Sequence, residues 1–116
     1  MEPQFTAGDD LIFQLESGFG LLRVLVVDSE RQVWHLLAYE ELFPDVEAAE
    51  RSLAEPESLH LLKGHMALTN RAFERTPAAK LGNRPVEENE LTDYRTWVEQ
   101  GGEVSDRSAL LMLGMR

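Results

Sequence analysis

Residues 8–39 read GDDLIFQLESGFGLLRVLVVDSERQVWHLLAY and contain three apolar segments, each about one strand long, separated by two turn signals. In the first segment Leu11, Phe13 and Leu15 share one face, and the residues between them are mostly polar. The first break, SGFG at residues 17–20, contains two glycines. Because glycine adopts positive φ without a steric penalty, this break predicts a tight hairpin.

The other two segments extend the same pattern. Residues 21–27 are aliphatic on both faces except at Arg23, as in a central strand that is covered on both sides. Residues 32–39 follow a polar break and carry Trp34 with other apolar side chains on one face. The three segments together predict an antiparallel β-meander that forms a curled sheet or a small barrel.

The rest of the chain predicts two amphipathic helices. The first spans about 45–55, because Asp45 is a good N-cap, apolar residues recur at helical spacing, and Pro56 ends the pattern. The second spans about 87–100, with glutamates in its first turns and a pair of glycines at its end.

Further strands are expected near 60–70 and 109–113. The segment 60–70 fits both a helix and a strand, and Gly64 favours the strand because glycine costs a helix about 1 kcal/mol relative to alanine. Residues 78–81 form either a brief strand or a loop, and the apolar run 109–113 is too short for a helix of its own. The predicted fold class is α+β, as a single domain over residues 1–116.

Charge is the unusual feature of the composition. The chain has 11 Lys and Arg against 21 Asp and Glu, for a formal net charge of −10. Before residue 59 there are 13 acidic and 3 basic side chains, and after it there are 8 of each. Such a surface repels phosphate backbones and speeds the approach of a basic molecule. We therefore expect a basic protein partner and no nucleic acid, although an acidic surface also serves solubility alone.

The sequence also limits the compartment and the chemistry. There is no cysteine, which excludes disulfides and cysteine-based metal sites from this chain. Residues 1–4 lack the features of a signal peptide, and no apolar run approaches the roughly 20 residues of a membrane span. The expectation is a cytoplasmic protein that does not contact membranes, with its oligomeric state left open.

No catalytic, metal-binding or cofactor-binding residue is assigned. His60 and His65 are five residues apart and diverge both in a strand and in a helix. His35 is expected to be an ordinary sheet histidine. Adjacent carboxylates such as Asp9 and Asp10 also diverge, and they are expected to be solvated. No phosphate-binding loop or nucleophile elbow occurs.

Acidic residues are the better candidates for binding. The polar side of the 45–55 helix and the segment that precedes it carry several carboxylates, and an aromatic residue of the third strand could join them. The candidate partner-binding residues are Glu40, Glu41, Glu47, Glu50 and Trp34.

The segment GDDLIFQLESGFG at residues 8–20, followed by Arg23, Val24 and Leu25, resembles the opening of a bacterial immunity-protein family, the Imm26-like proteins. Those proteins begin with a Gly-Asp step, an apolar strand, a glycine-aromatic turn and a second strand that starts near an arginine and a valine. The resemblance implies a small cytoplasmic α+β protein that neutralises a toxin by binding it, with no catalytic residues to carry over.

Three classes of function remain open. The first is an immunity-like or adaptor protein whose acidic surface binds a basic partner. The second is a small enzyme or ligand-binding domain with a cleft between the sheet and the 87–100 helix, where His35, Tyr39 or Arg23 converge. The third is a structural subunit whose C-terminal strand pairs with a second copy. The charge asymmetry, the missing catalytic signature and the resemblance favour the first.

Overall fold

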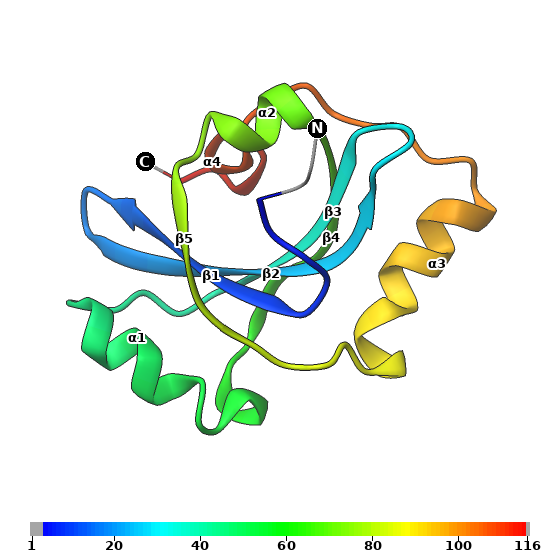
Figure 1. Cartoon of the computed structure of the whole chain (residues 1–116). Coiled ribbons are helices and arrows are strands. Elements are labelled where there is room, and N and C mark those ends of the chain that lie inside the picture. The colour runs from blue at the N-terminus through cyan, green and yellow to red at the C-terminus, as the bar shows by residue number, and fades with distance from the viewer. Residues whose placement is uncertain (1–3, 116) are drawn as a thin grey trace.

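A computed structural model describes residues 4–115, which form a five-stranded sheet with helices on both of its faces (Figure 1). The strands are β1 (Asp9–Leu15), β2 (Gly18–Asp28), β3 (Val33–Tyr39), β4 (Leu61–Thr69) and β5 (Ala78–Asn83). The α-helices of this part of the chain are α1 (Val46–Ser52), α2 (Asn70–Glu74), α3 (Thr92–Glu99) and α4 (Ala109–Leu113), and the 3-10 helices are η1 (Pro56–Ser58) and η2 (Glu88–Leu91). The α+β fold class is confirmed.

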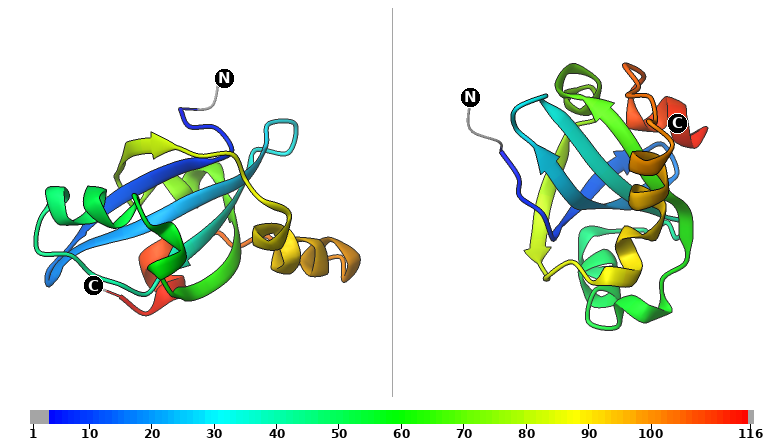
Figure 2. Two further views of the ribbon diagram at one scale, coloured as in Figure 1. Left: turned by 90° about the horizontal axis from the view of Figure 1, so that it is seen from below. Right: turned by 90° about the vertical axis from the view of Figure 1, so that its right-hand side faces the viewer.

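The sheet is antiparallel, with the strand order β4-β3-β2-β1-β5. β1, β2 and β3 pair in sequence order, so the predicted meander is confirmed. The sheet curls (Figure 2), but its two edge strands, β4 and β5, do not pair with each other within residues 4–115. It is therefore an open curled sheet and not the small barrel that was the other expectation.

The first hairpin turns earlier than predicted. Residues 16–17 join β1 to β2, so the two glycines of the SGFG segment belong to β2. Gly18 has a φ of +141° and lies against the carbonyl of Phe43, and Gly20 faces the ring of Phe13. A Cβ atom at either position would collide with these neighbours. Both glycines allow close packing, and neither forms the turn itself.

The segment 60–70, whose apolar residues fitted both a helix and a strand, forms β4. The helix α2 follows it and was not predicted. Thr69 is the last residue of β4 and the N-cap of α2, since its side chain accepts a hydrogen bond from the Ala72 N–H. After α2 the chain returns as β5 and pairs with β1, which settles residues 78–81 as strand.

Both predicted helices are present. Asp45 caps α1 by accepting a hydrogen bond of 2.7 Å from the Ala48 N–H. The predicted 87–100 helix is the consecutive pair η2 and α3, and Glu87 and Glu90 form a capping box at its start.

The strand predicted at 109–113 is wrong, because these residues form α4. Ser108 accepts a hydrogen bond from the Leu111 N–H at the start of the helix, and Gly114, with a φ of +68°, ends it. Caps at both ends stabilise a helix that is too short to form without them. This segment therefore offers no strand edge for pairing with a second copy.

The sheet separates two cores. On one face, here termed the aromatic face, Phe5, Trp34 and Phe73 pack together beneath α2 and α4. On the other, termed the charged face, Leu25 and Leu37 pack with residues of α1 and of the η2 region. In Figure 1 α2 and α4 lie above the sheet, α1 lies below it and α3 lies to the right.

Candidate functional site

A cluster of four charged side chains gives the charged face its name: Asp10, Arg23, Arg84 and Glu90. Asp10 on β1 lies opposite Arg23 on β2 in the ladder, and their side chains are only 2% and 1% exposed. Asp9 is equally buried, at 1% exposure. The expectation that this pair of aspartates is solvated is therefore wrong, because the fold supplies each of them with a cation.

Each nitrogen of the Arg23 guanidinium has an acceptor. Nε and Nη2 donate to the Glu90 carboxylate at 2.5 and 3.0 Å, and Nη1 donates to Asp10 at 3.3 Å and to the Gly8 carbonyl at 2.9 Å. Nη2 also donates to two carbonyls of the β5–η2 connection, at 3.1 Å each. A buried charge without such partners costs several kcal/mol. One side chain thus fastens the β5–η2 connection to β2.

Arg84 completes the cluster from the other side. Its Nε and Nη2 donate to the Asp10 carboxylate at 2.7 and 2.8 Å, and Nη2 reaches the Tyr39 hydroxyl at 3.3 Å. The hydrogen bonds with Asp10 outweigh burial and raise the pKa of Arg84. Burial alone would raise the pKa of Glu90, but its hydrogen bonds with Arg23 and with the Glu87 N–H lower it overall. Two guanidiniums and two carboxylates therefore balance one another at neutral pH.

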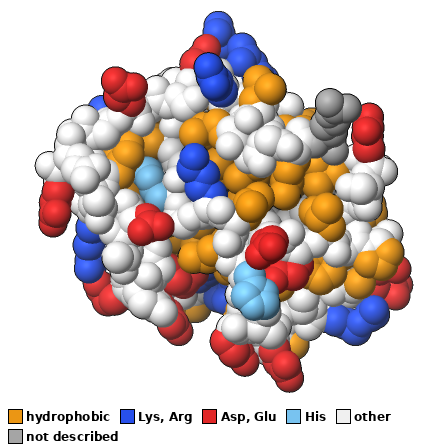
Figure 3. Space-filling model, turned by 180° about the vertical axis from the view of Figure 1, so that it is seen from behind, with side chains coloured by type: hydrophobic (Ala, Val, Ile, Leu, Met, Phe, Trp, Pro, Cys, Tyr) orange, Lys and Arg blue, Asp and Glu red, His pale blue; other side chains and the backbone are white. Residues whose placement is uncertain are grey.

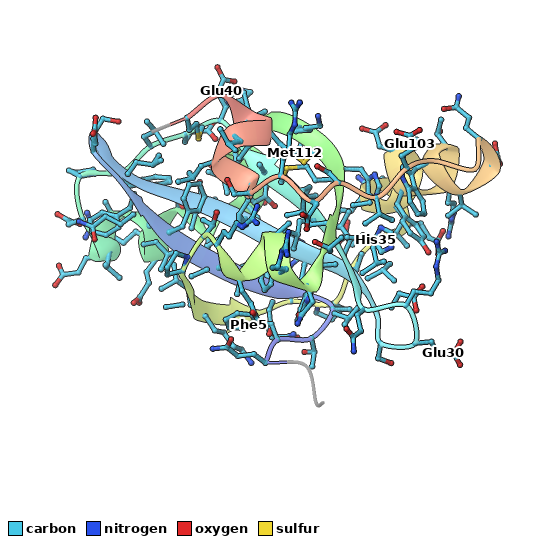
Figure 4. The ribbon with its side chains drawn as sticks, turned by 90° about the horizontal axis from the view of Figure 1, so that it is seen from above. Phe5, Glu30, His35, Glu40, Glu103 and Met112 are labelled. Atoms are coloured by element: carbon cyan, nitrogen blue, oxygen red, sulfur yellow. The ribbon has the colours of Figure 1, made fainter. Side chains whose placement is uncertain are left out.

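A pair of histidines lies further along the same face of the sheet. His35 Nδ1 on β3 and His65 Nε2 on β4 are 2.9 Å apart, and the two rings stack at 5.2 Å between centroids. Tyr94 and Trp97 of α3 pack edge-on against His35, at 4.8 and 4.9 Å. Figure 4 shows His35 between the sheet and α3. The pair attaches α3 to the sheet.

Both histidines are neutral at pH 7. Burial, and then the neighbouring His65, lowers the pKa of His35 to about 4. Burial also lowers the pKa of His65, with Asp93 opposing the shift and Lys63 adding to it. His35 is only 2% exposed, so its ring is closed to solvent. It is a packed hydrogen-bonding group, and the expectation of an ordinary sheet histidine missed its partner on β4.

Two adjoining hollows lie between β4 and the η2–α3 segment. The larger, of about 520 Å³, is lined by residues that include Leu37, Tyr39 and Leu61 from the sheet and Arg84 beyond β5. The smaller, of about 300 Å³, is lined by Lys63, Gly64, His65, Asp93, Thr96, Trp97 and Gln100. Gly64 and Asp93 line both. The two hollows are here termed the β4–α3 groove.

The larger hollow is acidic. Four carboxylates line it, from Glu57, Glu87, Glu90 and Asp93, against the single guanidinium of Arg84. Glu90 and Arg84 belong to the balanced cluster, so they do not offset the others. Within residues 4–115 no Lys, Arg or His side chain forms an ion pair with Glu57, Glu87 or Asp93. The larger hollow of the groove therefore combines an uncompensated negative charge with apolar walls.

Asp93 lies where the two hollows meet. Its Oδ2 is so close to Gly64 that a Cβ atom on residue 64 would collide with it. The glycine that favoured a strand in the sequence therefore also makes room for a carboxylate against β4. Asp93 is exposed and is the second residue of α3.

The predicted partner-binding residues lie elsewhere. Glu40, Glu47 and Glu50 are exposed, and Glu41 is tied to His60 by a hydrogen bond of 2.6 Å with the ring Nδ1. Trp34 is 4% exposed in the aromatic core, so it cannot belong to an exposed binding surface. None of the five lines the β4–α3 groove. Acidic side chains also gather along the lower edge of the face in Figure 3.

The second class of function called for a cleft between the sheet and the 87–100 helix, and the groove occupies that position. Tyr39 lines it, whereas Arg23 and His35 lie in the buried clusters beside it. Sequence reasoning missed Glu57, Asp93 and Arg84, because no local pattern links residues so far apart in the chain. The glutamates at the start of the 87–100 helix, such as Glu87, were expected only to stabilise the helix through its dipole.

Comparison with known proteins adds no relative: no family model, curated protein or solved structure matches the chain. Among residues 4–115 no group of three or more His, Asp or Glu side chains is placed to hold a metal ion. The same residues include no helix that is long and apolar enough to span a membrane.

Proposed function

We propose that this protein binds a basic protein partner in the β4–α3 groove. The observation that carries the proposal is the charge of the larger hollow, where Glu57, Glu87 and Asp93 have no basic partner within residues 4–115. A cation of the partner gains attraction there at little cost, since the exposed carboxylates keep most of their hydration.

The apolar walls narrow the kind of partner. Leu59 and Leu61 line the hollow, and both are accessible: Leu59 is half-buried and Leu61 is exposed. Lysine and arginine combine an apolar stem with a charged head, so one side chain can contact both the leucines and the carboxylates. A partner segment that carries basic and apolar residues fits this surface better than a purely polar one.

The resemblance of residues 8–20 to the opening of the Imm26-like proteins supports the same class of function. An immunity protein acts by occupying a surface of its toxin, and it needs complementary charge and no catalytic groups. We therefore propose an immunity-like or adaptor role in which binding itself is the activity.

A small cationic ligand is the second candidate. A hollow of about 520 Å³ is within the size range of small-molecule sites. A compact diamine such as putrescine would test this candidate, because it carries the charge without a peptide backbone.

The test uses fluorescence anisotropy with a short labelled peptide in which lysine alternates with valine. We expect the peptide to bind and its affinity to fall steeply with added salt, because exposed charges are screened. Glu57→Lys is expected to weaken binding about tenfold, as reversal of one close charge changes the energy by about 1 to 2 kcal/mol. Asp93→Asn should weaken it to a smaller extent.

Glu47→Lys is the matched control, because it makes the same change of net charge on the exposed surface of α1. We expect it to alter the affinity by less than about twofold. Equal weakening by the Glu47 and Glu57 variants would show that only net charge matters and would contradict the groove. Binding of putrescine alone, with the same sensitivity to Glu57→Lys, would favour the small-ligand candidate.

A further inference from the structure

One edge strand of the sheet is covered along half of its length. In the C-terminal half of β4, the Ala67 carbonyl accepts a hydrogen bond of 2.8 Å from the Ser105 N–H, and the Thr69 N–H donates one of 3.0 Å to the Ser105 carbonyl. A segment near the C-terminus thus pairs with the outer edge of β4 at this point.

The other half of the edge has no such cover. Within residues 4–115, residues 61–65 of β4 form backbone hydrogen bonds with β3 only. The ladder with β3 shifts register in this half, between the Leu36 and Ala38 pairs and again between the Ala38 and Tyr39 pairs, so part of the backbone of residues 61–65 has no partner on β3. Exposed edges of this kind are templates for another chain.

The β4–α3 groove follows the same half of the strand. Leu61 and Gly64 line the larger hollow, and Lys63 and His65 line the smaller one. A strand added to a sheet lies about 4.8 Å from its neighbour. An extended segment in the groove would therefore be placed both to pair with β4 and to contact the acidic wall that η2 and α3 supply.

The side chains of this half of β4 are unusually exposed for aliphatic residues. Leu61 is 55% exposed and Leu62 is 42% exposed. The ladder with β3 shifts register between the Lys63 and Leu61 pairs, so these two leucines lie on an irregular part of the edge strand. A strand paired at the edge would partly cover both at once.

We propose that the basic partner binds as an added β-strand along residues 61–65 of β4. This inference rests on the proposed function and specifies the conformation of the bound segment. Its basic side chains would lie near Glu57 and Asp93, and a neutral or acidic residue would lie opposite Lys63. Lys63 also disfavours pairing of two copies of this edge, because two lysines would then lie close together.

The opposite edge of the sheet provides a comparison within the molecule. β5 is also an edge strand, yet neither hollow of the groove includes any of its residues. Lys80 on β5 is held by Asp9 at 3.3 Å. Strand addition guided by the acidic groove should therefore involve β4 and leave β5 unchanged.

The test compares two methylated forms of the lysine–valine peptide, one with N-methyl groups on the lysine amides and one with them on the valine amides. Both forms keep the side chains and the charge. In an extended strand the two sets of amides face opposite directions, so one methylated form loses its bonds to β4 and the other keeps them. We expect one form to bind about tenfold more weakly and the other to bind within about twofold of the parent peptide.

Hydrogen exchange of the protein gives the second readout. Binding of the parent peptide should slow exchange at those amides of residues 61–65 that do not bond to β3, and leave the β5 amides unchanged. If the two methylated forms bind with equal affinity, whether or not that affinity is weaker than that of the parent peptide, strand addition is overturned. Binding of the parent peptide would in that case still support the proposed function. Slowed exchange on β5 instead of β4 would also overturn it. Failure of the parent peptide to bind would overturn both.

Discussion

On the aromatic face of the sheet, Trp34 and Phe73 stack at 4.4 Å and Phe5 packs edge-on against both, whereas on the charged face a guanidinium is buried among carboxylates and carbonyls. Ring packing gains free energy from each contact separately and depends little on pH. A buried ion cluster is favourable only while every member is present and charged. The same sheet thus has one face that tolerates gradual change and one that does not.

Removal of Arg23 should have the largest effect. Arg23→Met keeps much of the apolar stem but leaves Asp10 and Glu90 without their central cation, so we expect a loss of about 3 to 5 kcal/mol in the free energy of unfolding. Denaturation in urea at pH 7 measures it. A loss below about 1 kcal/mol would show that the cluster contributes little.

Leu68→Ala on the aromatic face is the apolar counterpart. Leu68 is fully buried, so we expect a loss of about 3 kcal/mol. The losses of stability caused by the two substitutions should depend differently on pH. The folded-state pKa of Glu90 is lowered, so its stabilising effect is present above its ordinary value of 4.5 and is lost as pH falls through the folded-state pKa.

The cost of Arg23→Met should therefore stay constant from pH 7 down to about 4.5 and shrink below it, while that of Leu68→Ala should stay constant throughout. Parallel urea titrations at several pH values test this difference. Equal pH dependence of the two variants would remove the distinction between the faces.

The histidine pair makes a smaller contribution that also depends on pH. The pKa of His35 falls from 6.5 to about 4 on folding, so between these values the unfolded chain binds more protons than the folded chain. Stability should fall by about 2 to 3 kcal/mol as pH drops through this window, and His35→Gln should remove that part of the fall. Unfolding followed by tryptophan fluorescence is a suitable measurement. An unchanged pH profile in the variant would contradict a buried neutral His35.

Lys80→Ala should have the smallest effect, although it also breaks an ion pair with a buried aspartate. Lys80 is 50% exposed, and Asp9 keeps a hydrogen bond of 2.8 Å from Asn83. We expect a loss of about 0.5 kcal/mol by urea denaturation. A loss as large as that of Arg23→Met would mean that exposure of the cation does not set the strength of these pairs.

The meander and the two longer helices could be predicted because their signals are local. Alternation of apolar residues, a proline and a capping aspartate each act within a few residues. The caps of α4, Ser108 and Gly114, are equally local signals for a helix. The length of the apolar run between them alone indicated a strand. The position of the first turn was predicted wrongly because Gly18 and Gly20 are required by close contacts in the folded chain. Gly18, for example, lies against the carbonyl of Phe43.

The candidate site could not be predicted, because its members meet only in the folded chain. Arg23 and Glu90 are 67 residues apart, and His35 and His65 are 30 apart. Before folding, Asp9 and Asp10 look like any solvated acidic pair. The acidity of the first half of the chain led to the prediction of Glu47 and Glu50 as binding residues. The groove is instead lined by Glu87 and Asp93 of the second half, where acidic and basic residues are equal in number.

The guanidinium of Arg23 has a consequence for synthesis of the chain. The ribosome releases β2 long before it releases Glu90 and the carbonyls of the β5–η2 connection, so the emerging sheet carries a cation that it cannot yet neutralise. Stable closure of this face must wait until Glu90 has left the ribosome. Fragments that stop before Glu90 should remain open and exposed to proteases, whatever the quality of their strands.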